Sequence, residues 1–305
     1  MSETIKVGEL ATALLALAKP ISSFDMPLLD SHGATLAEDV VVDGTALLRA
    51  GVRIRSTQIG LAASLGLDRL PTRPQPRVVV ISAGADLVEP GQKLTSEADE
   101  YETNSWLLTT AMKEAGVVSY RVHTIPKNSE ELRDVVEDQL VRSDLIVICG
   151  ESHDESFDLI FGVLKSLGEV QEVLPNIEGS GRHAFGTIGP DKTPVVALPG
   201  DPIAAYISTE LFIRPMARSM MGLHDIHRPV ITARLTNDVA STSGMHSFIR
   251  AVVTSDAPRQ VTAIENQSAL VSLSDATGLI IMNEDVTIKK SGSEVEVLLL
   301  ERRFN

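Results

Sequence analysis

Short apolar runs alternate with segments of helical periodicity between Arg77 and Met221, and this alternation limits the chain to few folds. The runs Arg77 to Ser82 and Leu145 to Cys149 are typical of buried strands, and Asn104 to Ala115 has helical spacing. Strands separated by helices pair in parallel, because a parallel pair needs a long crossover connection. The pattern therefore predicts an α/β domain with a mostly parallel sheet. Further strands are expected at Val117 to Ile125, Glu169 to Leu174, Ala184 to Ile188 and Val195 to Leu198, and further helices at Ser129 to Val141, Phe157 to Leu167 and Pro202 to Met221.

The segments on either side of this alternation differ from it. Residues 1–76 contain short helical patterns and end in the stretch Pro71 to Pro76, whose fixed backbone angles and missing N–H donors indicate a linker. The last part of the chain holds short apolar runs separated by turn residues, which predicts a small all-β barrel. We expect a reduced amino-terminal linker domain over 1–76, an α/β domain over 77–223 and a barrel over 224–305.

The composition excludes several classes of function. The formal net charge of −14 disfavours binding to nucleic acid or to an anionic membrane, because both attract clustered Lys and Arg. No run approaches the roughly 18 apolar residues of a membrane helix, and Met1 to Pro20 lacks the features of a secretory signal. We therefore expect a cytoplasmic protein. The single cysteine, Cys149, excludes an intrachain disulfide and a cysteine-rich metal site.

Three strands of the predicted sheet lead into segments rich in glycine and acids, after Ser82, Cys149 and Leu198. In open α/β sheets the ligand crevice lies outside the carboxyl ends of the strands. After Leu198 the sequence Pro199 to Pro202 reads Pro-Gly-Asp-Pro, in which an aspartate suits a helix N-cap and the following proline suits the first helical position. These three segments are the first candidates for a binding site.

The same segments carry motifs that occur together in one family. Val78 to Gly91 (VVVISAGADLVEPG), Tyr101 to Ser105 (YETNS) and Leu198 to Ala205 (LPGDPIAA) resemble the MoeA/gephyrin family, as do the flanks Leu36 to Val40 and Arg228 to Leu300. That family inserts molybdenum into molybdopterin and hydrolyses an adenylylated molybdopterin in the presence of a divalent cation. The resemblance implies a MoeA-like (MogA-like) three-layer α/β domain with a C-terminal β-barrel, molybdopterin and molybdate as substrates, magnesium as cofactor, and a homodimer.

The resemblance also implies roles for particular residues. Asp86 and Asp158 would be catalytic and would hold the magnesium ion. The loops at the carboxyl ends of the strands would bind the pterin and its phosphate, and Arg182 would attract molybdate. The implied substrate-binding residues are Ser82, Gly84, Glu102, Thr103, Asn104, Gly150, Ser152, Arg182, Pro199, Gly200, Asp201 and Pro202.

The sequence departs from the family pattern in two respects. Four residues join Val42 to Leu47, where family members carry a whole domain. The glycine-rich loop that would cradle a phosphate reads Cys149 to Glu155 (CGESHDE), which places like charge where an anion is expected. Of the family's cationic loop, only Arg182 keeps a positive charge, whereas Asp158 matches without change.

Three interpretations follow. The chain is a molybdotransferase of the MoeA type, with activity reduced or lost. Alternatively, it is a non-catalytic, gephyrin-like scaffold, in which the helix from Pro202 to Arg214 and the barrel frame a crevice for a protein partner. In the third interpretation the acids between Glu151 and Asp158 bind a divalent ion for a different reaction, although carboxylates near a helix start are also stabilised by the helix dipole alone.

Overall fold

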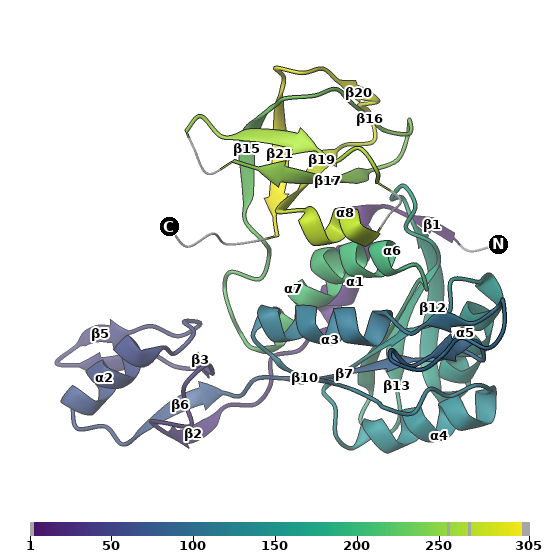
Figure 1. Ribbon diagram of the computed structural model, residues 1–305. Coiled ribbons are helices and arrows are strands. Elements are labelled where there is room, and N and C mark those ends of the chain that lie inside the picture. Colours follow the sequence, from purple (N-terminus) through teal and green to yellow (C-terminus); the bar gives the residue numbers. More distant parts are fainter. Residues whose placement is uncertain (1–2, 255–256, 268–269, 301–305) are drawn as a thin grey trace.

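The computed structural model describes residues 3–254, 257–267 and 270–300, and a seven-stranded sheet forms its centre (Figure 1). All neighbouring strands are parallel except β13, which is antiparallel to both of its neighbours. The mostly parallel sheet predicted from the alternation is confirmed. In spatial order the strands are β1 (Glu3–Ile5), β12 (Gly168–Pro175), β13 (His183–Ile188), β14 (Thr193–Leu198), β11 (Leu145–Cys149), β7 (Arg77–Ser82) and β10 (Val118–Arg121).

Helices cover both faces of this sheet, and the alternating direction of strand side chains supplies a core to each face. In β7, Val78 and Val80 pack with one set of helices, whereas Val79 and Ile81 pack with the other. This is the expected three-layer domain. The first set comprises α1 (Val7–Leu17), α3 (Asn104–Ala115), α6 (Pro202–Ser208), a π-helical turn η1 (Thr209–Ile213) and α7 (Arg214–Met220), and the second comprises α4 (Ser129–Leu140) and α5 (Asp154–Leu167).

The register of the central strands aligns their carboxyl ends. Cys149 at the end of β11 is paired with Ser82 at the end of β7 and with Leu198 at the end of β14. Three loops therefore leave the sheet at the same edge. This arrangement is the one expected for a crevice at the carboxyl ends of the strands.

The amino-terminal part forms a small unit beside the α/β domain (Figure 1). It has its own core of Leu36, Leu48, Ile54, Ala62 and Leu70. Its elements are β2 (Phe24–Pro27), β3 (Thr35–Leu36), β4 (Val40–Val42), β5 (Thr45–Leu48), α2 (Ser56–Ser64) and β6 (Arg69–Arg73).

A tight hairpin stands where the family resemblance implies a whole domain. Strands β4 and β5 pair across Asp43 and Gly44, which both have positive φ. Asp-Gly suits this turn, because both central residues must adopt the left-handed conformation. The short connection between Val42 and Leu47 therefore forms a regular two-residue β-hairpin turn.

Two features of the amino-terminal part differ from the prediction. Strand β1 pairs with β12, and Leu10 and Leu14 of α1 lie in the α/β core, so the chain enters the α/β domain before it forms the small unit. The predicted linker begins as strand β6, in which Pro71 contributes its carbonyl oxygen as the acceptor for Ala37 N–H. The division at residues 76/77 and 223/224 stays a prediction.

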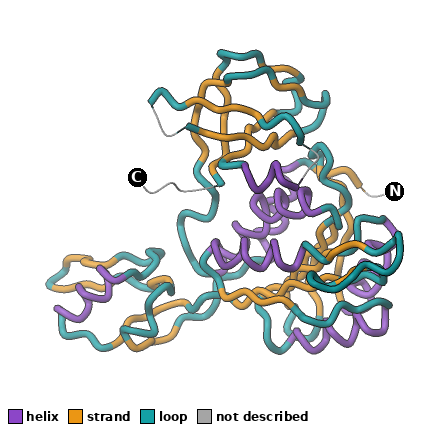
Figure 2. Tube along the Cα trace, in the orientation of Figure 1, coloured by secondary structure: helices purple, strands orange, loops and turns teal. Residues whose placement is uncertain are grey.

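The carboxyl-terminal part is a closed barrel, as predicted (Figure 2). A short helix, α8 (Leu270–Asp275), which the sequence analysis did not predict, contacts α6 of the α/β domain. Among the described residues no helix has both the length and the hydropathy needed to cross a membrane. The barrel strands are β15 (Val230–Leu235), β18 (Gln260–Ala263), β17 (Ser247–Val253), β19 (Gly278–Met282) and β21 (Glu294–Leu299). Two short pairs elsewhere join β16 (Val239–Ala240) with β20 (Ile288–Lys289), and β8 (Leu87–Val88) with β9 (Glu100–Tyr101).

Candidate functional site

The three loops at the carboxyl edge pack against one another through glycines. A Cβ on Gly200 would overlap the backbone carbonyl of Glu151, and a Cβ on Gly84 would overlap the Glu151 side chain. Because Gly84 and Gly200 have no side chains, the loops after β7 and β14 can both contact Glu151 in the loop after β11. Glycine allows such close backbone approach because it has no Cβ.

A small crevice of about 130 Å³ lies at this junction. Six of the predicted site residues line it, which places half of the implied substrate-binding set in one location. These six are Gly150, Ser152, Arg182, Pro199, Gly200 and Asp201.

Asn104 connects the helix α3 to the same crevice. Its side-chain amide donates a hydrogen bond of 2.7 Å to the carbonyl of Gly200. The residue is 5% exposed, and its Oδ1 has no hydrogen-bond partner among the described residues. A buried acceptor without a donor is unfavourable, so a ligand N–H at this point would be stabilised.

Asp201 and Pro202 form the start of α6 as the sequence predicted. Asp201 is the N-cap, and its Oδ1 accepts from the N–H of Ala204 at 2.8 Å. Pro202 follows in the first turn, where its missing N–H costs nothing. The Asp201 carboxylate is therefore occupied as a cap at the edge of the crevice.

The backbone donors of two loops are already bonded to carboxylates of the chain itself. Asp86 N–H donates to Glu151 Oε1 at 2.6 Å. The N–H and hydroxyl of Ser152 donate to the two carboxylate oxygens of Glu100, at 3.1 and 3.2 Å. Glu100 on β9 was not among the predicted site residues, because nothing in its local sequence indicates that it folds back onto this loop.

The predicted molybdate-attracting residue Arg182 is held by two carboxylates. Its Nη2 donates to Asp158 at 2.6 Å and its Nε donates to Glu172 at 2.6 Å, while its guanidinium lies 4.6 Å from the centre of the Phe157 ring. Hydrogen bonds to Glu172 and Asp158 raise the pKa of Arg182 despite partial burial. The positive charge of Arg182 is thus compensated within the chain.

The assignment of Asp86 and Asp158 as magnesium ligands stays a prediction. Magnesium prefers octahedral oxygen coordination, yet Asp158 is bonded to Arg182. In the part of the chain that the structure describes, no group of three or more His, Cys, Asp or Glu side chains could hold a metal ion.

Ser82 and Glu102 belong to a buried network that anchors α3. Glu102 is 1% exposed and accepts from the hydroxyl of Ser82 at 2.6 Å and from the backbone N–H of Ser105 at 2.7 Å. Arg121 pairs with Glu102 at 3.4 Å and lies 4.4 Å from the centre of the Trp106 ring, which is half exposed. Burial and these partners give Glu102 a structural role in fixing the loop that precedes Asn104.

Thr103 is the N-cap of α3, but its side chain does not cap the helix. Its hydroxyl donates to the carbonyl of Tyr101 at 3.0 Å.

Asp154, part of the predicted acidic loop, lies in α5, and its side chain is outside the described set. Glu155 is exposed in the first turn of α5.

A buried histidine next to the crevice was not predicted as a site residue. His183 follows Arg182 in β13; its Nδ1–H donates to the carbonyl of Gly181 at 3.1 Å, and its Nε2 accepts from the hydroxyl of Ser208 at 2.8 Å. Burial lowers the pKa of His183 to about 4. The ring is therefore neutral at pH 7.

The depressed pKa predicts a loss of stability in acid. As the pH falls below about 6.5, the unfolded state binds a proton at this histidine while the folded state does not until about pH 4. Between pH 7 and pH 5 the free energy of unfolding should fall by about 2 kcal/mol more in the wild type than in His183→Gln. Urea denaturation over a pH series measures this difference, and parallel pH profiles would contradict the assignment.

Arg250 is the second functional candidate that the sequence analysis missed. It lies in β17 and is 94% buried, and its Nε donates to the Ser272 hydroxyl of α8 at 2.8 Å. No described carboxylate forms an ion pair with it, and burial lowers its pKa while the charge of Asp201 raises it. The only sequence signal is one arginine within the apolar run Phe248 to Val253, which is too common to single out.

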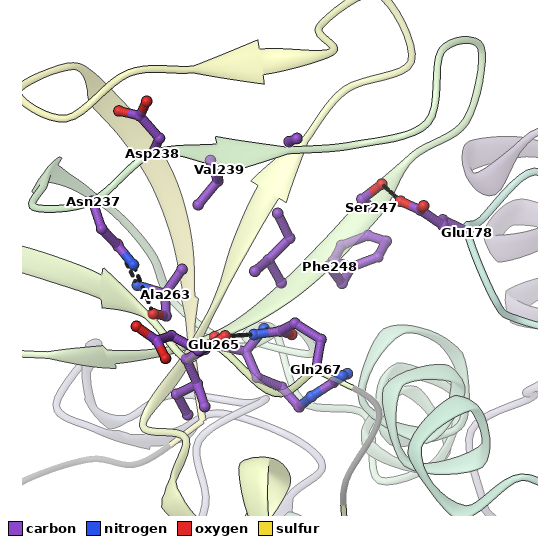
Figure 3. Close-up of a pocket in the computed structure, with 13 residues that line it drawn as sticks. Glu178, Asn237, Asp238, Val239, Ser247, Phe248, Ala263, Glu265 and Gln267 are labelled. Atoms are coloured by element: carbon purple, nitrogen blue, oxygen red, sulfur yellow. Dashed lines mark hydrogen bonds between the residues drawn. The ribbon is translucent and has the colours of Figure 1, made fainter.

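A larger cavity of about 580 Å³ opens between the barrel and the loop that carries Glu178 (Figure 3). Glu178 accepts from the hydroxyls of Ser247 and Thr242, and Phe248 lies beside this contact. Arg250 also lines this cavity, and the charge of Asp201, which lines the crevice, raises the pKa of Arg250. Among the described residues, none of the helix from Pro202 to Arg214 lines it, so the helix expected to frame a peptide crevice does not contribute here.

Two family models match the chain. The family described as "Probable molybdopterin binding domain" matches residues 79–219, and the family described as "MoeA C-terminal region (domain IV)" matches residues 232–300. The first match contains the three loops of the crevice, and the second contains Arg250. The crevice and Arg250, which lines the larger cavity, thus belong to two different matched regions.

Two known proteins are similar to this chain over most of its length. Molybdopterin molybdenumtransferase 2 of Mycobacterium tuberculosis is 33% identical over 280 residues, which cover 87% of this chain and 66% of that protein. Molybdopterin molybdenumtransferase 1 of the same organism is 27% identical, with 87% and 64% covered. The chain therefore spans about two thirds of the length of these relatives.

A solved structure shares the fold. The molybdopterin biosynthesis MoeA protein from Pyrococcus horikoshii superimposes with a TM-score of 0.81 at 19% sequence identity, over 98% of this chain and 100% of that chain. A molybdenum cofactor biosynthesis protein from Pyrococcus furiosus gives a TM-score of 0.75 at 21% identity, with 97% and 100% covered. At these identities the likeness establishes the fold alone.

Proposed function

Because this chain belongs to the MoeA family of molybdenum-cofactor biosynthesis proteins, we propose that it binds molybdopterin at the carboxyl edge of its sheet and inserts molybdate there. The substrate is the adenylylated form, which is hydrolysed as the metal is transferred. The names of the relatives in Mycobacterium tuberculosis support this activity. The chain spans only about two thirds of their length, so the activity is a proposal for this chain.

The buried guanidinium of Arg250 carries the proposal. Among the described residues no carboxylate pairs with this buried charge, which is unfavourable in the free protein, and an anion at that point would compensate it. Molybdate and the phosphate of molybdopterin are both anions. Arg250 is also within electrostatic range of Asp201, which lines the crevice.

Asn104 supports a place for the pterin. Its unpartnered Oδ1 offers a buried acceptor, and pterin rings carry N–H donors. The amide of the same side chain fixes the Gly200 loop, so Asn104 joins the ligand position to the start of α6. In this proposal Asn104 orients the pterin and Arg250 holds the oxyanion.

The other expectations from the resemblance stay part of the proposal. We infer a cytoplasmic homodimer whose small-molecule partner is the pterin. Magnesium is expected from the resemblance, but the described carboxylates offer it no complete donor set. A separate protein partner has no observation in its favour, and we do not propose one.

The experiment is a titration of the purified protein with molybdopterin and with its adenylylated form, with and without molybdate and magnesium. Calorimetry reports binding and chromatography reports nucleotide release. Binding in the micromolar range with molybdate-dependent release of AMP is the expected result. If neither form of the pterin binds, the proposal is wrong, and binding without release would reduce the function to that of a carrier.

A further inference from the structure

The crevice already contains an anion that belongs to the chain. Glu151 lines the crevice, and its Oε1 accepts the backbone N–H of Asp86 at 2.6 Å. A backbone N–H in a loop at the end of a strand is the kind of donor that binds a ligand phosphate. Here a carboxylate oxygen takes that position.

The surrounding backbone accommodates this side chain closely. The Glu151 side chain lies where a Cβ of Gly84 would be, and the backbone of the same residue lies where a Cβ of Gly200 would be. Glu151 is half-buried, although its neighbours Ser152 and His153 are exposed. The carboxylate is thus directed inward from an otherwise exposed loop.

The remaining crevice is small. Its volume of about 130 Å³ is less than the roughly 300–1,000 Å³ of typical ligand pockets. A second carboxylate, that of Glu100, accepts the N–H and hydroxyl of Ser152 on the same loop. A phosphate that approached these donors would meet occupied hydrogen bonds and like charge.

We propose that the carboxylate of Glu151 is an internal substitute for a ligand phosphate, and that it determines how strongly this crevice binds phosphate-bearing ligands. A phosphate must displace Glu151 from the Asp86 N–H before it can bind. The proposal rests on the proposed function, because it concerns the same crevice. It assigns to Glu151 a role in specificity that Glu155, which is exposed on the same segment, does not have.

The test compares Glu151→Ala with Glu155→Ala, using inorganic pyrophosphate as the probe. Each variant removes one negative charge from the same segment, but only Glu151→Ala frees the Asp86 N–H and enlarges the crevice. Calorimetry at low and moderate salt should show at least tenfold tighter pyrophosphate binding by Glu151→Ala than by the wild type. Glu155→Ala should change binding by less than about threefold, since exposed charges are screened.

Two outcomes would overturn the proposal. Equal gains in both variants would mean that net charge alone governs binding, and no gain in Glu151→Ala would mean that the carboxylate does not occupy an anion position. Thermal unfolding of each variant checks that the fold is intact. A second variant, Glu151→Gln, keeps the size and the acceptor oxygen but removes the charge, and it should bind pyrophosphate with an affinity between those of the wild type and Glu151→Ala.

Failure of this proposal is distinguishable from failure of the proposed function. Wild-type protein that binds molybdopterin, together with a Glu151→Ala variant that gains no pyrophosphate affinity, would overturn the role of Glu151 alone. A gain for Glu151→Ala without any molybdopterin binding by either protein would support the role of Glu151 and contradict the proposed function.

Discussion

Replacing Glu210 with alanine should lower the free energy of unfolding by about 3–5 kcal/mol, because a buried ion pair loses one partner. Glu210 is 2% exposed in η1, and its two carboxylate oxygens accept from Nε and Nη2 of Arg228 at 2.7 and 2.8 Å. Arg214 lies 3.9 Å from the same carboxylate, and two of its nitrogens have no hydrogen-bond partner in the part of the chain that the structure describes. Without Glu210 the buried Arg214 would lose the described carboxylate that it pairs with, and Arg228 would keep only the exposed Glu114 at 3.8 Å.

The position of Arg228 makes this pair important for the joint between domains. Arg228 precedes the first barrel strand, and its Nη1 also donates to the carbonyl of Leu300 after the last described strand. Burial opposes its charge, yet the bonds to Glu210 keep the pKa of Arg228 above its ordinary value. The loss of Glu210 should therefore weaken the attachment of the barrel to the α/β domain.

Guanidinium denaturation monitored by circular dichroism measures the effect. Glu114→Ala is the matched control, because Glu114 lies 3.8 Å from the same Arg228 but its side chain is 67% exposed. An exposed pair contributes about 0–1 kcal/mol. Similar losses in both variants would contradict the distinction between the buried and the exposed partner.

Replacing Arg250 with methionine should weaken molybdate and molybdopterin binding about a hundredfold, which corresponds to about 2.7 kcal/mol. Interactions of a charged group with a hydrogen-bonded partner contribute about 1.5–3 kcal/mol. The same substitution should leave stability unchanged or raise it. A buried charge without a carboxylate partner is removed, and the aliphatic replacement fills similar space.

The combination of weaker binding and equal or higher stability separates a ligand-binding role from a structural one. Arg182→Met is the control: Arg182 is paired with Asp158 and Glu172, so its loss should lower stability and change anion binding less. Calorimetric titration with molybdate and thermal unfolding supply the two readouts. A loss of stability in Arg250→Met as large as in Arg182→Met would show that Arg250 is mainly structural.

Much of the architecture could be predicted from local patterns. The helix over Asn104 to Ala115 and the strand at Leu145 to Cys149 match the structure, because periodicity and flanking turn residues are local properties. Strand β1 was not predicted, because three residues carry no period and pair only when β12 is beside them. The strand expected over Val117 to Ile125 ends at Arg121 in the structure, so Val122 to Ile125 lie outside it.

The position of the crevice was also predictable, whereas its state was not. The carboxyl ends of β7, β11 and β14 are a topological feature, and the sequence placed glycines and acids there. Whether an acid faces solvent, caps a helix or bonds to another loop depends on contacts between distant residues. Glu100 and Ser152 are 52 positions apart, and Glu151 and Asp86 are 65 apart.

The sequence by itself determined the fold class, the family and the edge of the sheet where a ligand would bind, because apolar period, turn residues and ordered motifs are encoded locally. Only the tertiary structure decided the charge balance of that edge. It paired Arg182 with Asp158 and Glu172, directed Glu151 to the Asp86 N–H, and left Arg250 buried without an ion pair to any described carboxylate. The physical reason is that the energy of a charge depends on its burial and on its partners in space, which are set by packing and not by sequence spacing.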